Sequence, residues 1–290
     1  MKRRFFLGVM GCMPLLGRSA SGTDTVPGEP AERYPLGCSL RVGIAFSGGS
    51  IHGMAHVGVL KAFTEKGLPF HYIAGTSAGA IVGVLAAAEL PLGDIEKIVR
   101  RIESPGVMGL SWSGRGLMQH AQLRSLIDRA LGGRSIEQLP IPFGAIATDL
   151  TTGERVIIRT GPAGAAISAS ASIPVLFEPV NIEGRDLVDG GLTEPVPAVA
   201  VREMGANFVI GVDVAFRPGE EAIQSLTGVA FQTMHIMGNA LINEQISRAD
   251  IAIRMNLHQL VGMENSHEKL IAAGYAAAMR AWPTLEKAIS

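Results

Sequence analysis

The sequence predicts a three-layer α/β fold, in which helices cover both faces of a central, mostly parallel β-sheet. Short apolar segments recur along the chain without the polar alternation of a half-exposed strand, as expected of strands buried on both faces. Helical patterns separate many of these segments, which is the order typical of a parallel sheet. Glycine is abundant, with 36 of 290 residues against a usual share of about 7%. This excess indicates many tight backbone turns.

The predicted elements alternate along the chain. The expected strands cover residues 41–46, 70–74, 143–148, 155–159, 186–188, 208–212 and 251–254. The expected helices cover residues 54–66, 77–90, 94–102, 119–131, 224–248 and 267–281. No internal repeat or linker interrupts residues 38–290, so we expect them to form one domain with a sizeable core.

The composition excludes two classes of protein. Hydrophobic residues make up 47% of the chain and charged residues 18%, which excludes global disorder. Lys and Arg number 25 and Asp and Glu number 26, so the formal net charge is −1. Because no overall basic field exists to attract nucleic acid, no nucleic-acid partner is expected.

The first 22 residues have the pattern of a secretory signal peptide. A basic start at Lys2–Arg4 precedes an apolar stretch too short to span a bilayer, and small residues at 19–22 offer a cleavage region. Residues 23–37 are polar and contain proline, which predicts a linker. The residues that end at Cys12 resemble a bacterial lipoprotein box, but the short apolar stretch before Cys12 favours export over a lipid anchor. We therefore expect an exported protein, periplasmic or membrane-associated.

Residues 75–79 have the form Gly-x-Ser-x-Gly, with Ser77 at the centre. Small flanking residues let a chain turn sharply from a strand into a helix and expose the serine oxygen. An apolar predicted strand leads directly into this motif and a predicted helix leaves it. The context therefore favours a nucleophilic serine at a helix N-terminus over the alternative, a plain helix-capping serine.

Residues 47–53, Ser-Gly-Gly-Ser-Ile-His-Gly, follow the first predicted strand and precede a helix. Backbone N–H groups in such a turn point toward an anion. A phosphate-binding P-loop would need Lys and then Ser or Thr after the last glycine, where this chain has Met and Ala. The remaining candidate is the oxyanion of a tetrahedral intermediate, held by Gly48, Gly49 and Ser50. A purely structural glycine turn stays as the alternative.

Asp189, Gly190 and Gly191 close the predicted strand at 186–188. The two glycines permit a tight turn and place one carboxylate at a strand end. Alone, this sequence would be an ordinary turn.

These three motifs, in this order, resemble the patatin-like phospholipase family of bacterial serine acyl hydrolases. Further segments similar to that family are residues 55–60, 148–153, 169–174 and 188–197, and the resemblance covers about residues 40–280. It implies hydrolysis of acyl esters, most of all phospholipids or lysophospholipids, through an acyl-enzyme and without a cofactor. Ser77 would be the nucleophile and Asp189 the base. The motif glycines would be Gly53, Gly75, Gly79, Gly190 and Gly191.

The resemblance is incomplete at the glycine-rich turn. The family's turn usually opens with Asp and carries Arg or Lys before its last glycine, whereas this chain has Ser47, Ser50 and His52. The backbone donors should persist, but His52 supplies no permanent positive charge near neutral pH. A carboxyl with an ordinary pKa near 4 is also a weak base, so contact with Ser77 and desolvation would have to activate Asp189.

The histidines offer weaker alternatives. His52 and His56 would share a helix face, but no third ligand accompanies them, so no metal site is expected. Packing or hydrogen bonding is the simpler expectation for His56. A Ser-His-Asp triad with His235 or His258 is less favoured than the Ser-Asp pair.

Two other functions stay open on the sequence alone. One is a catalytically silent lipid- or protein-binding module of the same fold, and the other is an esterase for small non-lipid esters. The apolar stretch at 105–118, with Trp112, offers a lipid-contacting surface, although core packing is the simpler explanation.

Overall fold

The computed structural model describes residues 39–102, 109–111, 114–217 and 225–289. The expected signal peptide, linker, Cys12 and Trp112 lie outside these residues. The strands of the main sheet are β1 (Val42–Phe46), β2 (Tyr72–Thr76), β5 (Phe143–Asp149), β6 (Arg155–Ile158), β7 (Val180–Ile182), β8 (Arg185–Asp189), β9 (Phe208–Asp213) and β10 (Ile251–Arg254). Their order is β10-β9-β1-β2-β5-β8-β7, with β6 paired to β5 off this path. The first five strands in this order, from β10 to β5, run parallel to one another. β6 and β8 pair antiparallel with β5, and β7 pairs antiparallel with β8. The predicted mostly parallel sheet is therefore confirmed.

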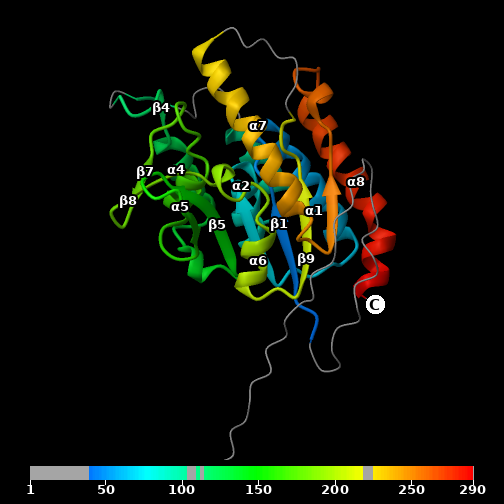
Figure 1. Cartoon of the computed structure of the whole chain (residues 1–290). Helices are drawn as coiled ribbons and strands as arrows, with labels where there is room; N and C mark the ends of the chain where they lie inside the picture. Colours follow the sequence, from blue (N-terminus) through cyan, green and yellow to red (C-terminus); the bar gives the residue numbers. More distant parts are fainter. Residues whose placement is uncertain (1–38, 103–108, 112–113, 218–224, 290) are drawn as a thin grey trace, which may run out of the picture.

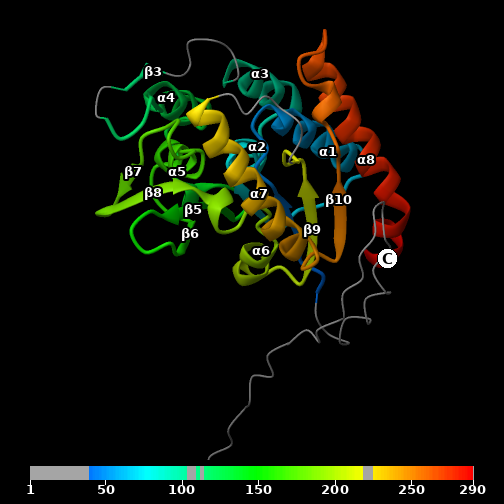
Figure 2. The same ribbon diagram turned by 45° about the horizontal axis from the view of Figure 1, so that its top comes forward.

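Helices cover both faces of this sheet (Figure 1). The larger layer contains α1 (Met54–Glu65), α2 (Ala78–Ala87), α3 (Leu92–Ile102), α4 (Ala121–Ala130), α5 (Ala163–Ser170) and α8 (Ser266–Ile289), which share one hydrophobic core. The opposite layer contains α6 (Ala198–Met204) and α7 (Leu226–Ile246), and Figure 2 shows α7 crossing the sheet beside α6. Within the described residues, no helix combines the length and apolarity needed to cross a bilayer.

The two faces of β1 explain the unequal layers. Ile44 and Phe46 face the larger core, while Ala45 packs against α6. A Cβ atom added to Gly43 would lie 2.1 Å from the Val201 side chain. The small residues of β1 therefore let α6 pack very close to the sheet.

The pairing of β5 determines where the ends of two other strands lie. β6 pairs with β5 from Ala145 to Thr148 and so occupies one edge of that strand. The other edge must carry both β2, whose Thr76 pairs with Ile146, and β8, whose Asp189 pairs with the next residue, Ala147. Since β2 runs parallel to β5 and β8 runs antiparallel, the two strands approach each other end to end.

Several elements differ from the prediction. Helices α5 and α6, strand β7 and the short hairpin of β3 (Gly109–Leu110) and β4 (Met118–Gln119) were not predicted. All eight residues of α5 are buried, so its sequence lacks the polar face that marks an amphipathic helix. Helix α8 continues through Pro283 to Ile289, and burial of Leu285 in the core favours this last stretch of helix despite the donor lost at the proline.

Candidate active site

Ser77 lies at a sharp turn between β2 and α2. Its backbone has φ 54° and ψ −121°, a positive-φ conformation that non-glycine residues rarely adopt. The motif glycines permit this turn, because a Cβ on Gly75 would lie 2.3 Å from the Gly79 carbonyl oxygen and one on Gly79 would lie 2.3 Å from the Phe46 carbonyl oxygen. Both glycines are therefore required by close backbone packing.

Ser170, which lies in the family-like segment at 169–174, supports the turn. The backbone N–H of Ser77 donates to Oγ of Ser170 at 3.0 Å. Both residues are buried, with Ser77 only 8% exposed. Ser170, at the end of α5, thereby satisfies an amide that the turn would otherwise leave without an acceptor.

Asp189 is the ionisable group that meets the serine. The Ser77 hydroxyl lies near enough to the Asp189 carboxylate to favour its ionised form, and the Gly191 N–H donates to Oδ1 of Asp189 at 2.7 Å. A Cβ on Gly190 would lie 2.4 Å from the Ile146 carbonyl oxygen. The Asp-Gly-Gly turn therefore packs against β5 and orients the carboxylate toward Ser77.

Burial changes the acid–base behaviour of Asp189. The side chain is withdrawn from water, and this desolvation raises its pKa from an ordinary 3.8 to about 6. Hydrogen bonds from the Ser77 hydroxyl and the Gly191 N–H favour the ionised form and limit the rise. Asp189 is consequently a stronger base than an exposed carboxylate, yet it is still largely ionised at neutral pH.

The glycine-rich turn presents two backbone amides. Gly48 donates its N–H to the Pro195 carbonyl oxygen at 3.1 Å, so that donor is already used. For Gly49 and Ser50 the described part of the chain supplies no hydrogen-bond acceptor to the amide. Gly48 lies beside Ser77, since its added Cβ would be 3.4 Å from that of Ser77. The structure thus brings the turn next to the serine.

Two buried histidines hold this turn. His56 donates from Nε2 to the Ser47 carbonyl oxygen at 2.9 Å, and burial lowers its pKa to about 4, so it is neutral at physiological pH. His52 donates from Nδ1 to the Val214 carbonyl oxygen at 2.9 Å and stacks on Phe216. The hydrogen-bonding role expected of His56 is confirmed.

The triad alternative gains no support from these contacts. The groups that act on the Asp189 carboxylate are the Ser77 hydroxyl and the Gly191 N–H. His235 stacks on Phe216, with ring centroids 5.5 Å apart, and His258 lies in a short 3-10 helix, His258–Leu260. Neither His235 nor His258 therefore gains support as a partner of Ser77.

The fold and these motifs define a three-layer α/β protein with a serine at a strand–helix turn, and comparison with known sequences gives its family. The patatin-like phospholipase profile matches residues 44–202, which is more than half of the chain and includes the turn, Ser77 and Asp189. The chain belongs to the patatin-like phospholipase family.

Three individual proteins that are similar to this chain share about a third or less of the aligned residues with it. An uncharacterised NTE family protein of Mycobacterium tuberculosis is 32% identical over 230 residues, which cover 77% of this chain and 64% of the relative. Lysophospholipase NTE1 of Cryptococcus neoformans is 32% identical over 185 residues, covering 61% of this chain and 11% of the relative. The crystal structure of VipD from Legionella pneumophila has a TM-score of 0.52 at 14% identity, covering 84% of this chain and 67% of that one. This last likeness shows the shared fold.

Proposed function

We propose that this protein is a serine acyl-ester hydrolase that uses Ser77 and Asp189 as a catalytic pair. The observation that carries the proposal is the placement of the Ser77 hydroxyl beside Asp189, a buried carboxylate of raised pKa. A nucleophile in contact with a base, at a strained strand–helix turn, is the arrangement that covalent acyl transfer requires.

The reaction would proceed in two balanced halves. The Ser77 oxygen attacks the ester carbonyl while its proton passes to Asp189. The tetrahedral intermediate then collapses to an acyl-enzyme, and the departing alcohol takes the proton from Asp189. In the second half water attacks the acyl-enzyme, again giving its proton to Asp189, and release of the fatty acid returns that proton to Ser77.

The oxyanion would be held by the amides of Gly49 and Ser50. These two have no acceptor among the described residues, whereas the Gly48 amide is engaged by Pro195. One such donor is worth about 3 kcal/mol in a preorganised site. The N-terminus of α2, directly after Ser77, adds a favourable partial charge. Gly48 would then shape the turn rather than bind the oxyanion.

The substrate class we propose is the phospholipid or lysophospholipid ester. The family description and the lysophospholipase name of one relative support this choice. Small soluble esters are the alternative, and the two are separated by whether the rate rises when a substrate passes from monomers into micelles.

A surface on α7 suits contact with a lipid aggregate. Residues 225–243 contain no Asp, Glu, Lys or Arg, although this helix lies at the protein surface. We define the α7 face as its exposed apolar side chains, Leu226, Val229, Ile236 and Met237, of which Leu226 is 88% and Met237 is 65% exposed. Helix α7 also packs against Gly190–Leu192, the turn that follows Asp189. We propose that the α7 face touches the lipid surface from which the substrate is drawn.

Labelling with a fluorophosphonate tests the central proposal. Covalent label on Ser77, found by peptide mass spectrometry and lost in Ser77→Ala, would support the proposed nucleophile. A folded protein that takes no label would instead support the silent binding module.

The proposed export is tested on the cellular protein. Fractionation and mass spectrometry of its N-terminus would show cleavage near residue 22, or a lipid-modified Cys12, if the chain is exported as we propose. An intact N-terminus in the cytoplasmic fraction would contradict this proposal.

A further inference from the structure

A short segment after Asp189 connects the parts of the proposed site. We call Thr193–Val196 the bridging segment. The Glu194 carbonyl oxygen accepts the Thr76 hydroxyl at 2.7 Å, and Thr76 immediately precedes the nucleophile. The Pro195 carbonyl oxygen accepts the Gly48 amide at 3.1 Å. Two adjacent carbonyl groups therefore hold the nucleophile strand and the oxyanion turn.

The same segment is linked to the base. Oγ1 of Thr148 donates to the Asp189 carbonyl oxygen at 3.1 Å and lies 2.9 Å from Oγ1 of Thr193. A shift of the bridging segment would thus displace the nucleophile strand, the oxyanion turn and Asp189.

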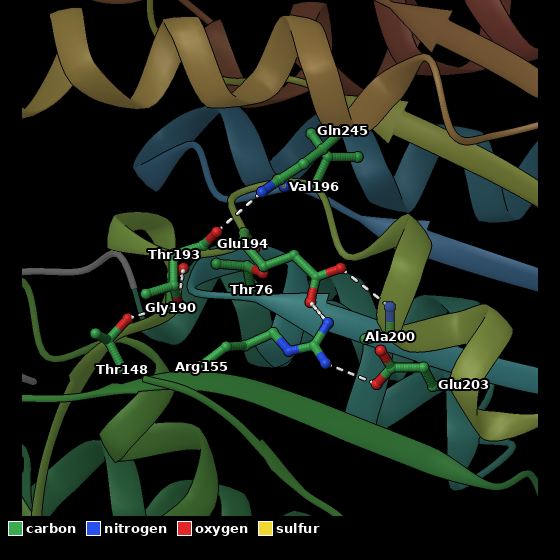
Figure 3. A network of polar contacts seen from close by, with 10 residues as sticks. All are labelled: Thr76, Thr148, Arg155, Gly190, Thr193, Glu194, Val196, Ala200, Glu203 and Gln245. Carbon is green, nitrogen blue, oxygen red and sulfur yellow. Dashed lines mark hydrogen bonds and ion pairs between the residues drawn. The ribbon is translucent and has the colours of Figure 1, made fainter. Parts of the chain in front are cut away.

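One side chain from another element fixes both ends of the bridging segment. Nε2 of Gln245 on α7 donates to the Thr193 carbonyl oxygen at 2.9 Å, and its Oε1 accepts the Val196 amide at 3.1 Å (Figure 3). Gln245 is buried, and Ile242 and Ile246 of the same helix form a small buried cluster with Val196. A side-chain amide can donate from its nitrogen and accept at its oxygen at the same time.

The middle of the bridging segment is held independently. The buried Glu194 carboxylate accepts the Ala200 amide at 3.0 Å and pairs with Arg155 at 2.9 Å, and Arg155 also pairs with Glu203 (Figure 3). This network keeps the segment attached to α6 and β6 when Gln245 is changed. Loss of Gln245 should therefore loosen the two ends without releasing the whole turn.

We propose that Gln245 is a positioning residue for acyl transfer, which aligns the oxyanion turn and the nucleophile strand by fixing the bridging segment. This proposal rests on the proposed function for its kinetic consequence, while its structural consequence is independent of any activity. The residue does not touch the reacting atoms. Its effect passes through Thr193 and Val196 to Gly48 and Thr76.

The test compares Gln245→Met, which keeps the length of the side chain but removes both strong hydrogen bonds, with Gln232→Met, the same change on α7 outside this network. We expect kcat for a soluble p-nitrophenyl ester to fall about 10- to 100-fold in Gln245→Met, as a small misplacement of catalytic groups does. KM should stay near the wild-type value. Hydrogen exchange of the Gly48 amide should accelerate at least about tenfold, and Gln232→Met should change neither quantity.

Two results would overturn the proposal: wild-type kcat in folded Gln245→Met, or unchanged exchange at Gly48. If Gln245→Met does not fold, Gln245→Glu takes its place, because it keeps the acceptor for Val196 and loses the donor to Thr193. Its kcat and the hydrogen exchange of its Gly48 amide then test the proposal in the same way. If the wild-type protein takes no fluorophosphonate label and hydrolyses no ester, the proposed function fails, while Gly48 exchange still decides whether Gln245 fixes the turn.

Discussion

Ser77 and Asp189 meet because the strands that precede them, β2 and β8, run toward each other along the same edge of β5. Thr76 and Asp189 pair with consecutive residues of β5, Ile146 and Ala147. Their separation is thus determined by backbone pairing, before any side-chain contact is considered. Backbone pairing therefore determines where the proposed catalytic pair lies.

The pH dependence of hydrolysis should report Asp189. As a general base it acts only when ionised, and burial raises its pKa to about 6. We expect kcat/KM for a soluble ester to rise with pH, reach half of its plateau near pH 6 and stay level above that. An acid limb centred near pH 4 would show that an ordinary exposed carboxyl controls the rate.

Replacing Asp189 with Asn should abolish turnover and stabilise the protein above pH 6. The folded-state pKa is raised, so the folded protein binds more protons than the unfolded chain between about pH 4 and 6, and wild-type stability falls as pH rises through that window. The neutral amide avoids this cost, which is on the order of 3 kcal/mol for a shift of about two pKa units.

Thermal unfolding as a function of pH tests this, with Asp186→Asn as the matched control. Hydrogen bonds from Asn181 and Arg115 lower the pKa of Asp186, so its stabilising effect is lost as pH falls. If Asp189→Asn is less stable than wild type at pH 8, the carboxylate contributes more to folding than its burial costs.

Alanine should be tolerated at Gly48 and harmful at Gly49. A Cβ on Gly48 would make an ordinary 3.4 Å contact, whereas one on Gly49 would lie 2.8 Å from the Val214 carbonyl oxygen. We expect near wild-type labelling by fluorophosphonate in Gly48→Ala and at least about a tenfold slower rate in Gly49→Ala, because a displaced oxyanion donor costs up to about 3 kcal/mol. Equal rates in the two variants would contradict the assignment of Gly49.

Ser170→Ala should slow labelling of Ser77 and destabilise the fold. It leaves the buried Ser77 amide without its acceptor, which costs about 1–3 kcal/mol. Ser168→Ala is the control on the same helix, because the Ser168 hydroxyl donates to the Gly164 carbonyl within α5. Chemical denaturation and labelling rates of both variants would test this, and matching behaviour of the two would argue against a special role for Ser170.

Charges on the α7 face should weaken lipid binding. Ile236 and Met237 are 55% and 65% exposed, so Asp should be accommodated at both without disturbing the core. Since burying one such side chain in lipid is worth about 1.5–3 kcal/mol, Ile236→Asp with Met237→Asp should lower partition onto phosphatidylcholine vesicles more than tenfold. Activity on a soluble ester should be unchanged. Undiminished vesicle binding would remove the α7 face from the proposal.

Sequence patterns predicted the mostly parallel sheet because its strands are continuous apolar runs, and they singled out Ser77 and Asp189 because each sits in a motif at a strand end. They did not show that the Gly48 amide is occupied by Pro195, since that contact depends on a fold-level approach between distant segments. Gln245 was missed for the same reason, and Ser170 was noted only as part of the family-like segment at 169–174, without a role. The partner of each side chain is known only once its helix is packed.

The meeting of β2 and β8 also has a consequence during synthesis. Ser77 and Asp189 lie 112 positions apart in the chain, and pairing of both strands with β5 brings them together. A growing or unfolded chain therefore carries Ser77 without Asp189 beside it. If the protein crosses a membrane before it folds, the proposed hydrolase would be inactive in transit, and the proposed lipid hydrolysis would begin only where folding is completed.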